Sequence, residues 1–190
     1  MKPNTHASSS ITAPVMDATA IDRALRRIAH EIIERNPDLD SVILAGIPSR
    51  GVAIARRLAD IIESLGQQRV ATGAIDVSMH RDDVGTRPEL PRVQVSTLPL
   101  PLEGKTIIIV DDVLFTGRTV RAAMDAISSF GRPARIQLAA LIDRGHRELP
   151  IRGDYVGKNL PTAPDEQVQL RLQDVDGEPD AVWLIKEETR

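Results

Sequence analysis

Two adjacent carboxylates, Asp111 and Asp112, stand directly after an apolar, β-branched run at 106–110. The sequence TGRT follows at 116–119, and apolar residues at helical spacing begin at Val120. Ionised carboxylates only accept hydrogen bonds, so this pair suits the two hydroxyl donors of a vicinal diol such as that of ribose. Backbone N–H groups at the start of a helix suit a phosphate, because the helix dipole favours an anion there. The order of these features predicts a site for a ribose 5-phosphate.

Each half of this segment also has a purely structural interpretation. Aspartate and threonine are ordinary helix caps, and two aspartates can simply end a strand. We favour binding because both halves occur together at the carboxyl end of a buried strand, where open α/β sheets bind their ligands. Neither GxxxxGK[ST] nor GxGxxG occurs in the sequence, which excludes a Walker loop and a dinucleotide-binding loop.

Apolar periodicity predicts the elements that must position these residues. Helix 17–35 has the clearest signal, since apolar residues recur at i, i+4, i+7 and i+11 from Ile21, and Asp17 or Thr19 can cap it. Strands that alternate with helices favour a mostly parallel α/β sheet. The predicted strands are 41–46, 70–79, 106–110, 136–142, 167–172 and 181–186, and the predicted helices are 17–35, 51–64 and 117–130.

Two segments depart from this alternation. Residues 1–15 are mostly polar and serine-rich, and we expect them to be a disordered tail. Residues 80–101 lack periodicity and contain four prolines, which is typical of a functional lid or a disordered loop. The remainder, 16–190, is predicted to form a single domain.

The composition limits the classes of function. The chain has 190 residues, 42% of them hydrophobic, which is enough for a real core. One Trp, one Tyr and two Phe weaken any case for RNA binding on stacked aromatic platforms. The net charge of −3 means that RNA affinity would need a local basic patch. Cysteine is absent and no apolar run of about 18 residues occurs, so we expect a cytoplasmic protein that spans no membrane.

The segment TIIIVDDVLFTGRT (106–119) resembles the signature with which type I phosphoribosyltransferases bind phosphoribosyl pyrophosphate, PRPP. A longer resemblance, from about Met16 to the end, is to the PyrR family of pyrimidine operon regulators, which also have uracil phosphoribosyltransferase activity. It implies a type I phosphoribosyltransferase fold: a mostly parallel, twisted α/β sheet flanked by helices, with a small hood. The matching segments are RALRRIAHEIIERN (23–36), IPSRG (47–51), IDVSMHRDD (75–83), VDDVLFTGRTVRAAMDAI (110–127) and IQLAALIDRGHRELPIRGDYVGKNLPT (136–162).

The implied reaction is displacement of pyrophosphate from C1 of PRPP by uracil, which gives UMP, with Mg²⁺ bound to PRPP. Catalytic roles fall on Asp111, Asp112 and Arg50. Residues 80–101 become the lid, and 143–165 become a hood that recognises the base. The residues implied to bind PRPP are Ser49, Arg50, Gly51, Arg81, Asp111, Asp112, Val113, Leu114, Phe115, Thr116, Gly117, Arg118 and Thr119.

Other parts of this assignment keep an alternative. Ser49 could simply cap the next helix while Arg50 is solvated, but a pyrophosphate needs a second anion site near the first. Asp82 and Asp83 could help to hold Mg²⁺ or could form a charged, solvated turn. At the uracil site we expect Arg144, Tyr155, Val156 and Lys158, together with backbone groups around 155–157.

Basic side chains predict the second function. The polar face of helix 17–35 carries Arg23, Arg26, Arg27 and His30, and Arg35 lies at its end. A solvated face would be the ordinary interpretation, but by resemblance these positions match the surface that binds the leader RNA of the pyrimidine operon. His146, Arg147, Arg152 and Lys158 look like its remainder. We do not assign His146 as a general base, because its arginine-rich surroundings are equally typical of a phosphate-contacting surface.

The resemblance further implies a homo-oligomer, a dimer or a tetramer, that responds to UMP or UTP. Two alternatives remain at this point. One is a purine-type phosphoribosyltransferase that serves salvage, which would share 106–119. The other is an RNA regulator that senses PRPP or nucleotides with negligible catalysis.

Overall fold

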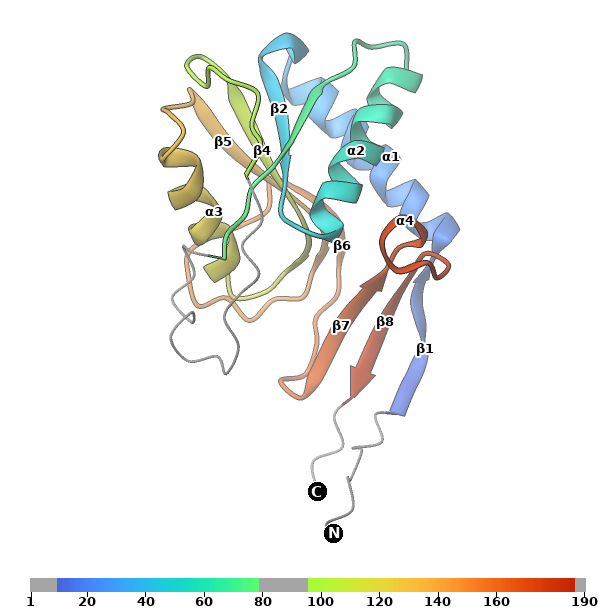
Figure 1. The fold of residues 1–190 in the computed structure, drawn as a ribbon. Coiled ribbons are helices and arrows are strands. Elements are labelled where there is room, and N and C mark those ends of the chain that lie inside the picture. The colour runs from blue at the N-terminus through green and yellow to red at the C-terminus, as the bar shows by residue number, and fades with distance from the viewer. Residues whose placement is uncertain (1–9, 79–95, 187–190) are drawn as a thin grey trace.

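The computed structural model describes residues 10–78 and 96–186, and its core is a parallel sheet (Figure 1). Five strands lie in the order β3-β2-β4-β5-β6, and each neighbouring pair is parallel. A nine-residue strand, β4, lies in the middle, hydrogen-bonded on both sides. The bounds are β2 (Val42–Gly46), β3 (Ala71–Ala74), β4 (Thr106–Leu114), β5 (Arg135–Asp143) and β6 (Tyr155–Asn159).

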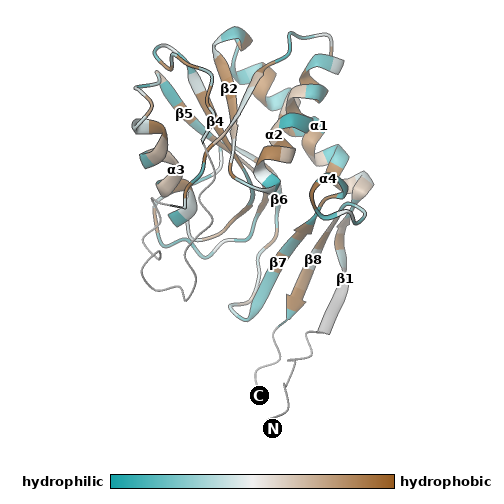
Figure 2. Cartoon of the chain, in the orientation of Figure 1, coloured by the Kyte–Doolittle hydropathy of each residue, from teal (hydrophilic) through white to brown (hydrophobic). Residues whose placement is uncertain are grey.

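Helices cover both faces of this sheet. Helices α1 (Ala18–Arg35) and α2 (Arg50–Ser64) pack on one face, and α3 (Arg118–Ser128) packs on the other. A short 3₁₀ turn, η1 (Leu39–Ser41), links α1 to β2. Apolar colour lies along the strands and the helix sides that face them (Figure 2), as two faces that are both buried require. No helix in the described part of the chain is long and apolar enough to cross a membrane.

A second, antiparallel sheet forms the hood beside the core. Its strands β1 (Ser10–Asp17), β8 (Ala181–Lys186) and β7 (Glu166–Arg171) lie in that order, and a one-turn helix, α4 (Gln173–Asp176), follows β7. The strand at the N-terminal end pairs with β8, so the prediction of a disordered tail is wrong for residues 10–15. The hood therefore joins the two ends of the described chain.

Most predicted elements are confirmed, and so is the α/β fold class. Helix 17–35 forms as α1, and the Asp17 side chain caps it by accepting a hydrogen bond of 2.7 Å from the backbone of Ala20. The strand predicted at 106–110 instead runs on to Leu114, because pairing with β5 continues as far as Asp143. Strand β3 is shorter than the predicted 70–79 and ends at Ala74.

Two loop predictions have different outcomes. Region 143–165 is not simply a hood, since it contains β6, the fifth strand of the core sheet. The periodicity did not reveal β6 because it is short and carries Gly157, Lys158 and Asn159. The lid predicted at 80–101 falls mostly outside the described residues. Its end is described, and there Thr97 pairs with Ala74.

Two glycines let the start of α2 lie directly against the sheet. A Cβ on Gly46 would lie 2.4 Å from the Cα of Val52. One on Gly51 would lie 2.4 Å from the carbonyl oxygen of Val110, the residue before the two aspartates. Both distances are far below van der Waals contact, so only glycine permits this packing. The loop between β2 and α2 is thereby held beside the end of β4.

Gly46→Ala should therefore destabilise the protein by about 1–3 kcal/mol, the usual cost of overpacking a core. Urea denaturation measures the free energy of unfolding. As a control, Gln67→Ala in the exposed loop after α2 should change it by less than about 0.5 kcal/mol. Equal stability of the two variants would contradict the packing argument.

Candidate functional site

The two aspartates lie at the carboxyl end of the central strand. Asp111 is only 7% exposed, whereas Asp112 is half-buried. The backbone N–H of Asp112 donates to Asp111 Oδ1 at 3.0 Å, and that of Val113 donates to Asp112 Oδ1 at 2.9 Å. These bonds orient the carboxylates against their own strand. The sheet thus presents two fixed acceptors where the sequence predicts a diol.

The loop after β4 leads directly into α3. Gly117 has φ of 92°, a left-handed conformation that favours glycine, and α3 begins at the next residue. The hydroxyl of Thr116 accepts from the backbone N–H of Arg118 at 3.3 Å. In the segment after β5, the backbone N–H groups of Glu148 and Leu149 donate to the carbonyl of Thr116 at 3.0 and 3.1 Å. This is the helix start that the sequence predicts for a phosphate, braced by the segment after β5.

The second predicted anion site lies beside the first. The N–H of Ile47 donates to the carbonyl of Val110 at 2.9 Å, so the end of β2 is joined to the end of β4. Ser49 is exposed, and its side chain makes no capping hydrogen bond to α2, which contradicts the interpretation that it merely caps this helix. The peptide bond between Pro48 and Ser49 is cis. Both loops therefore open at the same edge of the sheet.

Arg50 is not solvated but is paired with the hood. Its Nη2 lies 2.8 Å from Asp176 Oδ1 and its Nε 3.2 Å from Asp176 Oδ2, and the backbone N–H of Leu172 also donates to this carboxylate. Although burial opposes ionisation, these donors hold the pKa of Asp176 below its ordinary value. Asp176 was missed by the sequence analysis, because it lies 126 residues from Arg50 and belongs to no motif.

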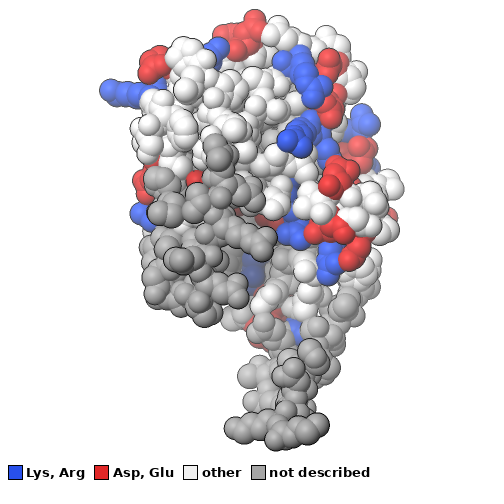
Figure 3. All heavy atoms as spheres, viewed as in Figure 1, with Lys and Arg blue, Asp and Glu red and all other residues white. Residues whose placement is uncertain are grey.

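A second arginine of α2 strengthens the same junction. Arg57 pairs with Asp174 at 2.9 Å and with Asp180. Its guanidinium lowers the pKa of Asp180 against the opposing effect of burial. Figure 3 shows charges of both signs interleaved on the side of the molecule that carries α2 and α4. The hood is thus attached to the helix that opens the second anion site.

The predicted base-contacting residues do not gather in one place. Tyr155 is fully buried, and its hydroxyl bonds to Asn36 and Gln137, so its side chain belongs to the core, and base contact through its backbone stays a prediction. The carbonyls of Val156 and Gly157, expected to face the base, accept instead from Arg27. The side chains of Val156 and Lys158 line two different pockets.

Arg144 is likewise a structural residue, which contradicts its assignment to the base. It is 7% exposed, its Nε donates to Thr162 Oγ1 at 3.1 Å, and its Nη2 donates to the carbonyl of Glu166. The guanidinium carbon lies 4.0 Å from the ring centroid of Phe115. Desolvation lowers its pKa, against the opposing charge of Glu166. Arg144 therefore connects the phosphate loop to the hood.

The basic residues of α1 differ in whether their side chains form hydrogen bonds or ion pairs. Arg26 pairs with Asp22 at 2.8 Å, Arg27 pairs with Glu31 and holds the edge of β6, and Arg35 donates to the carbonyl of Asp154. Arg23 and His30 are exposed and have no hydrogen bond or ion pair in the described part of the chain. Arg23, Arg27 and Lys158 line one pocket of about 400 Å³.

The remaining basic residues lie in the segment between β5 and β6. His146 has φ of 57°, its Nε2 lies 2.7 Å from the carbonyl of Thr162, and its ring meets Phe115 edge-on. Arg147 is engaged in several hydrogen bonds, while Arg152 is exposed. Arg147 and Arg152 line a second pocket, together with Val156.

Some predicted residues cannot be placed. Arg81, Asp82 and Asp83 lie outside the described residues. Within 10–78 and 96–186, no group of three or more His, Asp or Glu side chains is arranged to hold a metal ion. The carboxylates of Asp111 and Asp112 are nevertheless of the oxygen-donor type that Mg²⁺ accepts alongside substrate oxygens.

Comparison with known proteins gives a consistent result. The family described as phosphoribosyl transferase domain matches residues 15–174. The chain is 52% identical over 172 residues to the "Bifunctional protein PyrR" of Roseiflexus sp. (strain RS-1), covering 90% of this chain and 94% of that protein. To the protein of the same name from Chloroflexus aurantiacus it is 56% identical over 170 residues, covering 90% and 93%.

Solved structures resemble the chain in fold. The hypoxanthine phosphoribosyltransferase of Trypanosoma cruzi has a TM-score of 0.71 at 19% identity, covering 93% of this chain and 98% of that one. The HGPRT-ase of Leishmania tarentolae in complex with GMP has a TM-score of 0.72 at 16% identity, covering 94% and 98%. At this identity the likeness concerns the arrangement of helices and strands.

The junction between α2 and the hood gives a pH prediction. Asp180→Asn should lower the free energy of unfolding at pH 7 by about 1.5–3 kcal/mol, the usual contribution of a hydrogen bond to a charged group. The pKa of Asp180 is lower in the folded than in the unfolded protein, so its stabilisation is complete above about pH 4 and is lost as the pH falls through the folded pKa.

Urea denaturation of the wild type and Asp180→Asn between pH 7 and pH 3 measures this effect, with the exposed Asp125→Asn as the control. The difference between wild type and Asp180→Asn should shrink in the acid. A difference that stays constant with pH would contradict the ion pair.

Proposed function

Because this chain belongs to the phosphoribosyltransferase family, and within it to the bifunctional PyrR proteins, we propose which of its residues carry its two activities. These activities are transfer of a phosphoribosyl group to uracil and regulation of pyrimidine genes. The observation that carries the assignment is the junction at Val110. Its carbonyl joins the two predicted anion loops, and the two aspartates follow it directly.

In this proposal PRPP binds across that junction. The backbone of 115–119, with the hydroxyls of Thr116 and Thr119, receives the 5-phosphate at the start of α3. Asp111 and Asp112 accept hydrogen bonds from the two ribose hydroxyls. Ser49, Arg50 and Gly51 receive the pyrophosphate, and Arg81 is proposed to join them. This order along the substrate follows the order of the loops along the edge of the sheet.

The chemistry then consists of positioning and charge neutralisation. As uracil displaces pyrophosphate from C1, the ribose develops oxocarbenium character and the leaving group gains negative charge. Arg50 stabilises that charge, and Asp176 keeps its guanidinium in place before the substrate binds. Mg²⁺ bound to PRPP would supply positive charge that screens the pyrophosphate. Asp111 and Asp112 carry carboxylates of the oxygen-donor type that such an ion takes alongside substrate oxygens.

We propose that uracil lies between the end of β4 and the hood rather than among Arg144, Tyr155 and Lys158. Strand β7 contacts β4, and Val168 of β7 packs against the same buried cluster as Val113, the residue after Asp112. The hood segment 166–176 is therefore the part of the described chain that adjoins the ribose carboxylates from the far side. It also carries Asp176, which fixes Arg50.

For regulation, we propose binding to the leader RNA of the pyrimidine operon through the basic side chains that the fold leaves exposed. These are Arg23 and His30 on α1, Lys158 on β6, and Arg152. They carry no ion pair within the described residues, so they can neutralise phosphates without breaking a structural contact. Arg26, Arg27 and Arg35 contribute positive charge to this surface while they hold it together. UMP or UTP at the PRPP site would modulate the binding.

This regulator would act in the cytoplasm, where the nascent transcript is, and as a homodimer or a tetramer. A second copy would extend the basic surface of α1. The alternatives of a purine-specific enzyme and of a regulator with negligible catalysis make different predictions for product formation. Incubation of PRPP with a panel of bases separates them, and we expect UMP as the main product.

The ribose assignment predicts the effect of removing both carboxylates. Asp111→Asn plus Asp112→Asn should lower kcat/KM for UMP formation by at least about 100-fold, since each hydrogen bond to a charged group contributes about 1.5–3 kcal/mol. Circular dichroism should show an unchanged fold, and Asp125→Asn on α3 should retain full activity. Undiminished UMP synthesis would refute the assignment.

The RNA assignment predicts a salt dependence. Arg23→Ala plus Lys158→Ala should weaken binding of the leader RNA and reduce the slope of log K against log salt by about 2, roughly one per lost phosphate contact. UMP synthesis should not change. Arg69→Ala, which removes an exposed arginine from the loop after α2, is the control and should bind RNA normally. Identical affinity of the double variant and wild type would exclude this surface.

A further inference from the structure

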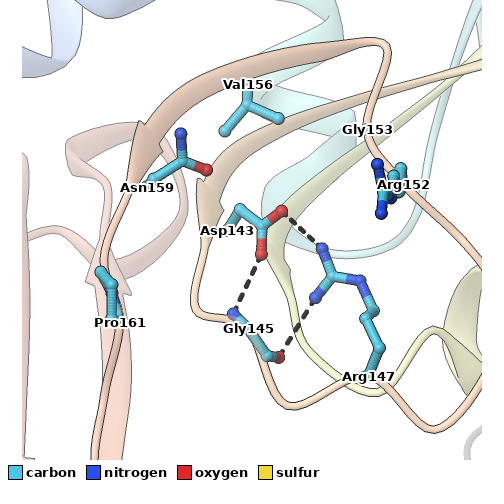
Figure 4. Close-up of a pocket in the computed structure, with 8 residues that line it drawn as sticks. All are labelled: Asp143, Gly145, Arg147, Arg152, Gly153, Val156, Asn159 and Pro161. Atoms are coloured by element: carbon cyan, nitrogen blue, oxygen red, sulfur yellow. Dashed lines mark hydrogen bonds and ion pairs between the residues drawn. The ribbon is translucent and has the colours of Figure 1, made fainter.

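A pocket of about 450 Å³ opens beside the edge strand β6, outside both anion loops (Figure 4). Its volume falls in the range of about 300–1,000 Å³ that is usual for small-molecule sites. None of the residues proposed to bind PRPP lines it. The lining residues are Asp143, Gly145, Arg147, Arg152, Gly153, Val156, Asn159 and Pro161.

The guanidinium of Arg147 forms one fixed wall of this pocket. It donates to the carbonyls of Ile151 at 2.8 Å, Phe115 at 2.7 Å and Gly145 at 3.1 Å, and it pairs with Asp143. Figure 4 shows it directed at Asp143. Because its in-plane donors are engaged in this way, Arg147 is poorly suited to grip a phosphate. Its side chain remains 22% exposed, and guanidinium planes are surfaces on which unpaired bases stack.

The pocket also carries polar side chains that are not engaged. Asn159, the last residue of β6, is exposed, and its amide has no hydrogen bond among the described residues. Arg152 is likewise exposed and makes no ion pair in this part of the chain. Val156, Gly153 and Pro161 complete the lining. The planar guanidinium of Arg147, the amide of Asn159 and the exposed Arg152 lie in one pocket with apolar lining. This combination suits a nucleotide.

We propose that this pocket takes one unpaired adenine of the RNA partner. The base stacks on the face of Arg147, the amide of Asn159 pairs with its donor–acceptor edge, and Arg152 contacts the adjoining phosphate. An asparagine amide offers a donor and an acceptor side by side, which is the pattern that matches adenine N6 and N7. The inference rests on the proposed RNA binding and gives that surface a base-reading site.

The same side chain connects this pocket to the ribose phosphate loop. Arg147 holds the carbonyl of Phe115, where that loop begins, while the next residues, Glu148 and Leu149, hold the carbonyl of Thr116. Any ligand that shifts or rigidifies the loop therefore acts on the wall against which the base stacks. This gives nucleotide binding a physical route to RNA affinity.

The test compares Asn159→Ala with wild type in filter binding to the leader RNA. We expect affinity to fall by at least about fivefold, the lower end of what one bidentate base contact contributes. The salt slope should stay unchanged because no charge is removed. UMP synthesis should also be unchanged, which shows that the variant is folded. Gln67→Ala, an exposed amide in the loop after α2, is the matched control.

A second measurement locates the base directly. RNA in which single adenines carry a photoreactive group should crosslink to peptides that contain residues 143–161 at one position, and this crosslink should disappear in Asn159→Ala. Unchanged affinity of Asn159→Ala, while Arg23→Ala plus Lys158→Ala still binds weakly, would overturn the pocket but not the RNA surface. If all these variants bind like wild type, both proposals fail.

The pocket could alternatively serve a free adenine nucleotide. Titration with AMP in the absence of RNA distinguishes the two sources. Weak AMP binding, with RNA affinity lost in Asn159→Ala, supports a base of the RNA. Tight AMP binding that is lost in Asn159→Ala, with RNA affinity unchanged, would overturn the proposal in favour of a free ligand.

Discussion

The central strand β4 is the constraint on which the remaining architecture depends. It is hydrogen-bonded to β2 on one side and to β5 on the other, and residues 107–110 are fully buried between two helical layers. This rigidity places Asp111 and Asp112 at one edge of the sheet. The Val110 carbonyl binds the end of β2, and the packing of Gly51 against it holds the start of α2. Two anion loops and two carboxylates are thus arranged by one strand.

The hood and the segment after β5 are attached to that edge by arginines. Arg50 and Arg57 join α2 to α4 and to Asp180, just before β8. Arg144 joins the phosphate loop to β7, and Arg147 holds the same loop through the carbonyl of Phe115. The sequence alone does not show which arginines hold the structure together and which stay exposed. Residues that resemble one continuous basic surface along the chain separate into those that hold the structure and those that remain exposed, such as Arg23 and Arg152.

The sequence was informative where local pattern determines structure. The apolar run, the aspartate pair and the TGRT segment predicted a strand that ends in two carboxylates and leads through a short loop into a helix. The spacing of Ile21, Leu25 and Ile28 predicted α1. The sequence was uninformative about contacts between residues that are far apart along the chain. Strand β6 is short and polar at its end, Tyr155 is buried by contacts with Asn36 and Gln137, and Asp176 reaches Arg50 across 126 residues. Such pairings leave no periodic signal, since they depend on the finished fold.

The most direct test of the account is whether the nucleotide site and the RNA surface are coupled. Filter binding of the purified protein to its own pyrimidine-operon leader RNA should be measured with and without UMP, across a salt series. The account predicts that UMP tightens binding by about 5–150-fold, the usual range of allosteric coupling, and that affinity falls steeply with salt. Equal affinity with and without UMP would contradict the coupling, and binding no better than to a control RNA would contradict the regulatory role itself.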